Sequence, residues 1–297
     1  MRAAVVAFAL LVGCSHAPAG GSDGGGGSDG GGVDVSAWAN PERVTIDGWS
    51  DTAMEPFVSR DGGYLFFNSS NAPGVDTDLQ YATRTDDLTF TFAGAIGGVN
   101  SSALDAVASE DDAGDFYFIS TRSYASDMET IYRGTFAAGA VTNVAVVPLV
   151  PSAAGHVIFD AVVSPDGHTL SFAEGDYSTG ALTTASLALA NDAGGAFARD
   201  PASDATLAAV NLAGATQYAP VFSKSLGELY FTRIGSDGVP TIYGAARASA
   251  DAPFGAPVHL DAITGFAEAP TLSPDEKSLY YHARDPSGVF TIYRVTR

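Results

Sequence analysis

Residues 164–172 read SPDGHTLSF: a serine, a tight Asp-Gly turn and a short apolar run, a combination typical of a β-hairpin. Similar segments recur along the chain, and the serines that mark them are Ser59, Ser109, Ser164, Ser223 and Ser273. Successive serines are 50, 55, 59 and 50 residues apart. Repeats of about this length are typical of propellers and solenoids. The hairpin is therefore one copy of a repeated unit.

Each copy has the same arrangement of strands. An apolar strand leads to the serine, a turn follows, and a second strand comes next, at residues 65–67, 116–118, 170–172, 229–231 and 279–281. Four of these five second strands are apolar at three consecutive positions, whereas a strand with one face in water should alternate. We therefore expect both faces to be covered, as happens when sheets stack around an axis.

A third strand follows in each copy, and an outer fourth strand carries a looser pattern. The chain ends at Arg297, just after the third strand of the last copy. Near the N-terminus, Trp38-x-x-Pro41-x-x-Val44 repeats the spacing of the outer strand Phe254-x-x-Pro257-x-x-Leu260. An N-terminal strand that completes the last sheet would close a ring and hide its open edges. We predict five blades of four antiparallel strands, closed in this way.

The repeat resembles the WD40-like (PD40) repeat of TolB-type β-propellers. The segments SPDGHTLSF and SPDEKSLYY (273–281) carry this likeness, together with TIY at residues 130–132, 241–243 and 291–293. The resemblance covers about residues 36–297 and implies an all-β propeller. TolB-type propellers commonly have six blades, so a six-bladed ring, with a degenerate blade in residues 185–215, is the alternative.

The first residues are predicted to be a targeting signal. Arg2 precedes an apolar run at residues 3–12 that is too short to cross a bilayer and fits a signal peptide. The run ends in Leu-Val-Gly-Cys, which looks like a bacterial lipobox, so residues 1–14 are predicted to be a lipoprotein signal peptide with Cys14 lipidated. Ser15 is not the Asp that retains lipoproteins at the inner membrane, which favours the outer membrane of the cell envelope. Residues 15–34 are a Gly/Ser/Asp-rich flexible linker, and residues 35–297 form the propeller domain.

Composition limits the partners and cofactors. The formal net charge is -20, from 34 acidic against 14 basic residues. This charge repels nucleic acid and anionic lipid, so we expect no nucleic-acid partner and membrane contact through the lipid anchor only. The single cysteine forms neither an internal disulfide nor a cysteine-based zinc site. No cofactor is predicted, with calcium as the one candidate.

Acidic residues recur before the serines and suggest a site. Glu55, Asp105 and Asp160 stand four positions before their serines, and Glu268 is displaced by one residue in the last copy. In the second copy, alignment on Ser109 gives Asp105 this position and leaves one extra residue in the turn. In a propeller these acids would surround one mouth of the central channel, where they bind a cation or a basic peptide tail or, alternatively, only cap strand ends.

Three arginines follow the second strands: Arg122, Arg233 and Arg284. The family resemblance implies that they brace neighbouring loops or blades. We expect each to pair with a neighbouring carboxylate, and the alternative is that they bind an anion. Residues 35–297 contain no G-x-S-x-G elbow, H-E-x-x-H motif or phosphate loop. We therefore expect a binding or scaffolding module for an envelope protein or peptide. The alternative is a glycan-binding or glycoside-hydrolysing propeller with carboxylates in its central pocket.

Overall fold

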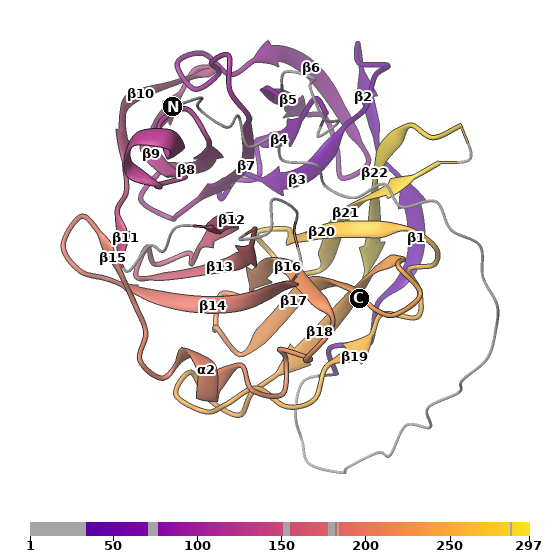
Figure 1. Cartoon of the computed structure of the whole chain (residues 1–297). Coiled ribbons are helices and arrows are strands. Elements are labelled where there is room, and N and C mark those ends of the chain that lie inside the picture. The colour runs from indigo at the N-terminus through magenta and orange to yellow at the C-terminus, as the bar shows by residue number, and fades with distance from the viewer. Residues whose placement is uncertain (1–33, 71–76, 151–154, 178–181, 183, 286) are drawn as a thin grey trace.

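The computed structural model describes residues 34–70, 77–150, 155–177, 182, 184–285 and 287–297. Within these ranges the chain is all-β, with two single-turn helices, α1 (Tyr124–Asp127) and α2 (Ser203–Thr206). The strands surround a central axis, as Figure 1 shows. No helix in these ranges is long and apolar enough to span a membrane. The predicted signal peptide, with Cys14, and residues 15–33 of the predicted linker lie outside the described residues.

The strands pair in antiparallel groups, each called a blade below and numbered in chain order. Blade 1 holds β3 (Met54–Val58), β4 (Tyr64–Asn68), β5 (Leu79–Arg84) and β6 (Thr89–Ala95). Blade 2 holds β7 (Asp105–Glu110), β8 (Asp115–Ser120), β9 (Ile131–Ala137) and β10 (Ala140–Val146). Blade 3 holds β12 (His156–Val163), β13 (Thr169–Asp176), β14 (Thr184–Asp192) and β15 (Phe197–Arg199).

Blade 4 holds β16 (Thr216–Phe222), β17 (Glu228–Ile234), β18 (Pro240–Ala246) and β19 (Val258–His259). Blade 5 holds β20 (Ala267–Leu272), β21 (Ser278–Arg284), β22 (Phe290–Thr296) and, from the other end of the chain, β1 (Ala39–Arg43). Two short strands add parallel pairs: β2 (Thr45–Asp47) beside β6, and β11 (Leu149–Val150) beside β15. Residues 185–215, which would hold the degenerate blade of the six-bladed alternative, carry most of β14 together with β15 and α2.

The first strands of the blades contact one another in a cycle: β3 with β7, β7 with β12, β12 with β16, β16 with β20, and β20 with β3. The fold is therefore a β-propeller with these strands innermost. The predicted count of five blades, with six as the alternative, stays a prediction.

The apolar triplets of the second strands are explained by packing on both faces. Phe66 packs edge-on against Phe116 of blade 2, with ring centroids 5.1 Å apart. Leu65 and Phe67, which point the other way, share a core cluster with Tyr280 of blade 5. All three residues of the triplet are fully buried. Because each strand is covered by a blade on either side, it needs no polar face.

The predicted ring closure is confirmed. Strand β1 pairs antiparallel with β22, with Glu42 opposite Arg294 and Arg43 opposite Tyr293. The Arg294 and Glu42 side chains form an ion pair across the two strands at 3.1 Å. Just before β1, Trp38 is only 4% exposed in a core cluster with residues of blades 4 and 5. The N-terminal strand therefore completes the last sheet and removes its open edge.

Every first strand has a bulge at the same place. The residue in the left-handed region is Glu55, Val107, Asp160, Ala219 or Ala269, with φ between 48° and 54°. A non-glycine residue in this region costs roughly 1–2 kcal/mol, so five repetitions indicate a required geometry. Each bulge breaks the pairing register with the second strand of its own blade.

The bulges correct the alignment of the second copy. The left-handed residue there is Val107, so Asp105 does not correspond to Glu55. Four residues after the bulge, Ser59 accepts a hydrogen bond from the backbone N–H of Tyr64 through its Oγ, and in blade 2 Asp111 Oδ1 accepts from Asp115. The alignment on Ser109 was wrong by two residues because an aspartate carboxylate can close this turn as a serine hydroxyl does.

Candidate functional site

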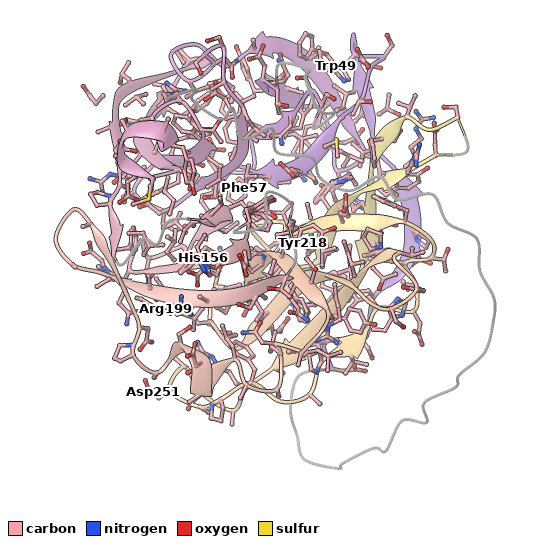
Figure 2. The ribbon with its side chains drawn as sticks, viewed as in Figure 1. Trp49, Phe57, His156, Arg199, Tyr218 and Asp251 are labelled. Atoms are coloured by element: carbon pink, nitrogen blue, oxygen red, sulfur yellow. The ribbon has the colours of Figure 1, made fainter. Side chains whose placement is uncertain are left out.

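The candidate site lies where the first strands meet on the axis. Figure 2 shows Phe57 and Tyr218, from β3 and β16, near the middle of the ring. The bulges place Glu55 and Asp160 on the wall of a small axial cavity of about 30 Å³. Beyond these acids the wall is mostly apolar, with Phe57 and Val162 from the same two strands. The cavity is therefore negatively charged at one level and narrow throughout.

A hydrogen-bonded chain joins blades 4, 5 and 1 at this level. His282 Nδ1 accepts from the backbone N–H of Glu55 at 3.0 Å, so the ring proton must sit on Nε2. That Nε2–H donates to one oxygen of Glu268 at 2.8 Å. The other Glu268 oxygen accepts from the hydroxyl of Tyr218. Glu268 thus has both oxygens bonded to protein groups.

Burial and neighbouring charges disfavour the ionised form of Asp160. Burial, followed by the charges of Glu55 and Glu268, holds the pKa of Asp160 well above its usual value, while the Ala219 backbone N–H acts in the opposite direction. Burial and the Asp160 charge raise the pKa of Tyr177 to about 12. Asp160 therefore holds a proton more readily than an ordinary aspartate does.

In blades 1, 4 and 5, one repeat position on the second strand bonds the blade to the next one. Asn68 Oδ1 accepts from the backbone N–H of Val107, and Thr232 Oγ1 accepts from that of Ala269. His282 occupies the same position and holds Glu55. Because each acceptor satisfies the N–H of a bulge in the neighbouring blade, these side chains stabilise both the strained backbone and the blade interface.

Asp105 lies in a different environment from the other three acids. It is fully buried, and Arg122 Nη2 approaches its Oδ1 to 2.5 Å. Its other oxygen accepts from the backbone N–H and the hydroxyl of Ser101. Of the four acids predicted at the channel mouth, Glu55, Asp160 and Glu268 interact with one another, while Asp105 holds a turn and an arginine.

The three arginines have different neighbours. Arg122 pairs with Asp105 and lies over the Tyr132 ring at 5.0 Å. Arg233 donates to the carbonyl of Val210 at 2.7 Å and stacks on Tyr243 at 4.6 Å. Arg284 lies 6.0 Å from the ring of Phe290. Among the contacts of the described residues, only that of Arg122 is the carboxylate pairing expected from sequence.

A further arginine lies at the other end of the channel. Arg60 Nε donates to the carbonyl of Glu110 at 2.7 Å, and Nη2 donates to that of Val163 at 3.3 Å. Its guanidinium lies 5.2 Å from the ring of Phe57. Glu110 and Val163 are the last residues of β7 and β12. The channel is therefore lined by acids at the bulges, whereas at the carboxyl ends of these strands the Arg60 guanidinium lies among acids that include Asp112, Glu110 and Asp111.

Several residues of the site were not predicted from sequence: Asn68, Tyr177, Tyr218, Thr271 and His282. A signal existed for three of them. Asn68 and His282 occupy one repeat position, directly after the apolar triplet. Tyr218 and Glu268, which bond to each other, both precede the left-handed residue of their strands. In the part of the chain that the structure describes, no three His, Cys, Asp or Glu side chains are placed to hold a metal ion. Calcium stays a prediction.

Comparisons with known proteins support the fold. The chain is similar to an α-L-arabinofuranosidase from Podospora anserina, solved with cellotriose, at 13% identity over 87% of this chain and 95% of that one, with a TM-score of 0.54. A family 117 glycoside hydrolase from Zobellia galactanivorans gives 14% identity, coverages of 89% and 91%, and a TM-score of 0.51. TolB from Acinetobacter baumannii gives 14% identity and a TM-score of 0.45. The match covers 82% of this chain and 54% of that TolB chain. No family model and no curated protein matches the sequence.

Proposed function

We propose that the chain is an exported, lipid-anchored β-propeller that binds a protein or peptide partner in the bacterial cell envelope, through the acidic end of its channel. The observation that carries this proposal is the cluster of Glu55, Asp160 and Glu268, which share one level of the ring and act on one another electrostatically. A basic segment would relieve that repulsion, because opposite charges favour the ionised carboxylates. The repeat's likeness to TolB-type propellers adds the envelope setting.

The cavity dimensions favour binding over catalysis. Pockets that enclose a small molecule are usually about 300–1,000 Å³, at least about ten times the volume found on this axis. Both oxygens of Glu268 are already bonded to Tyr218 and His282. A partner therefore contacts the acidic level, defined by Glu55, Asp160 and Glu268, from outside the cavity. Only a small group of the partner enters the cavity itself.

The test is a crosslinking pull-down from intact envelopes that compares matched charge changes. Glu55→Gln with Asp160→Asn removes two acids from the acidic level. The control, Asp204→Asn with Asp261→Asn, removes two acids whose side chains are 88% and 96% exposed on the outside of the ring. We expect the partner to be recovered with wild type and control and lost with the first pair. Equal recovery with both pairs would overturn the proposal.

One observation favours glycan hydrolysis as a second candidate. Asp160, with its raised pKa, lies close enough to Glu55 to feel its charge, which is the arrangement of a protonated acid beside a second carboxylate. Two proteins of similar fold are named an α-L-arabinofuranosidase and a family 117 glycoside hydrolase. Release of nitrophenol from 4-nitrophenyl α-L-arabinofuranoside by wild type, and its loss in Asp160→Asn, would favour this function over the first.

A further inference from the structure

The axial cavity contains a polar group whose partner is missing from the described protein. Thr271, on β20, lines the cavity together with Glu55 and Asp160 and is 2% exposed. Its Oγ1 has no hydrogen-bond partner among the described residues. A buried hydroxyl without a partner is unfavourable, and native structures rarely retain one unless water or another ligand bonds to it. Thr271 therefore indicates that something polar occupies the cavity.

The size of the cavity limits that occupant. A volume of about 30 Å³ accommodates a water-sized group, and neither a sugar ring nor an ion with a complete hydration shell fits. The rest of the wall at this level consists largely of Phe57, Val162 and Val221, which offer no side-chain hydrogen bonds. The occupant is thus a single small group with little or no water of its own.

The charge around the cavity sets the sign of the occupant. Glu55 and Asp160 are on the wall, and Glu268 acts on Asp160 from β20. The groups that act most strongly on Asp160 are these acids and the Ala219 backbone N–H, with no basic side chain among them. A cation is therefore attracted and an anion is repelled.

The ligands available limit the charge of the cation. Calcium takes six to eight oxygen ligands, and magnesium keeps several waters, for which the cavity has no room. The described residues also lack three acidic or imidazole ligands placed around one point. A monovalent cation of water-like size can be held by the Thr271 hydroxyl oxygen, the Glu55 carboxylate and a carboxyl oxygen of Asp160 without these requirements.

We propose that the axial cavity binds one desolvated monovalent cation, with Thr271 Oγ1, Glu55 and Asp160 as ligands. The same chemistry can come from an inorganic ion or from the primary ammonium group of a partner's lysine. The lysine source rests on the proposed function, because it makes this cavity the place where a basic partner inserts its charge. The inorganic source does not depend on a partner.

The test measures the melting temperature of the full-length chain at constant ionic strength while choline chloride is replaced stepwise by KCl, NaCl or NH4Cl. Choline screens charge equally but is too large for the cavity. A ligand that binds only the folded state raises the melting temperature with a saturating dependence on its concentration. We expect such a rise in wild type with at least one small cation and none with choline.

Variants test whether the rise in melting temperature depends on the Thr271 hydroxyl. Thr271→Val should remove the saturating rise and leave the melting temperature in choline at or above that of wild type, since an unpaired hydroxyl is gone. Thr271→Ser should keep the rise. Thr291→Val, which changes a buried threonine on β22, should also keep it. The proposal is overturned if small cations and choline act alike on wild type, or if Thr271→Val retains the rise.

The same titration with an organic ammonium ion identifies the source of the cation. n-Butylammonium presents a lysine-like ammonium on an alkyl chain. If it reproduces the rise and potassium competes with it, the cavity admits a tethered ammonium. If only inorganic ions act, the cation belongs to the propeller itself. A pull-down that fails while the potassium effect persists would reject the proposed function alone, and the cation site would stand.

Discussion

Replacing Trp38 by alanine tests how far the ring depends on its N-terminal closure. Trp38 precedes β1 and packs edge-on against Tyr230 of blade 4, with ring centroids 5.6 Å apart. The guanidinium of Arg297, at the end of the chain, lies 4.6 Å from its ring. The indole thus connects the N-terminal strand to blade 4 and to the C-terminal residue. Its removal should weaken the closure without touching the acidic level of the channel.

The size of the effect follows from burial. A buried aromatic side chain removes about 150–250 Å² from water, which corresponds to about 4–6 kcal/mol at about 25 cal/mol per Å². Trp38 is 4% exposed, so nearly all of this applies, and tryptophan-to-alanine changes in cores cost about 3–5 kcal/mol. For a domain of this size, each kcal/mol lowers the melting temperature by about 2–4 °C. We expect a decrease of about 6–20 °C.

The assay is thermal and urea unfolding of the full-length chain, followed by circular dichroism. Trp38→Phe keeps an aromatic ring and should lose less than half as much stability. Trp49→Ala removes the other tryptophan, which is only half-buried and packs on Phe67 and Phe92 within blade 1. Should Trp38→Ala cost no more than Trp49→Ala, the closure would not be a main source of the ring's stability.

Three further predictions concern buried charge and the anchor. Arg122→Met should cost about 3–5 kcal/mol in urea unfolding, because it leaves the fully buried Asp105 unpaired, whereas Arg284→Met should cost much less. The raised pKa of Asp160 means that its folded form keeps a proton that the unfolded chain releases near pH 3.8. The contribution of this proton to stability is therefore complete below that pH and is lost as the pH rises through the pKa of Asp160 in the folded state. Asp160→Asn should remove this loss from the pH profile of the melting temperature. An unchanged profile would contradict the assignment. Cys14→Ala should abolish labelling with a lipid precursor, and persistent labelling would reject the predicted anchor.

The sequence predicted features that depend on local pattern and repetition. Triplets such as Leu65–Phe67 indicated strands covered on both faces, and the spacing around Trp38 indicated that β1 closes the last sheet; both are seen. These patterns can be recognised in one sequence because the second strand of every blade is covered on both faces and so needs similar apolar residues. The repeats within the chain can therefore be compared with one another.

The site was harder to predict because it depends on one backbone bulge. An alignment that is shifted by two residues puts Asp105, in place of Val107, at the left-handed position. A pattern built on serines does not reveal that Asp111 closes the turn in blade 2. The partners of Glu268 lie on two other strands, so no spacing in the chain brings Tyr218 and His282 together. Such contacts exist only once the ring has formed.

The two ends of the channel give a direction to any ligand that enters it. At the bulges, Glu55 and Asp160 attract cations, whereas at the carboxyl ends of β7 and β12 the Arg60 guanidinium is fixed by two carbonyls and covers Phe57. The positive charge of Arg60 is offset at this second end by acids that include Asp112 and Glu110. The apolar wall at Phe57, however, offers a bare ion no solvation, so passage from this end to the acids is unfavourable. A basic group avoids that wall if it enters where the bulges lie, and this is the face on which we expect a partner to dock.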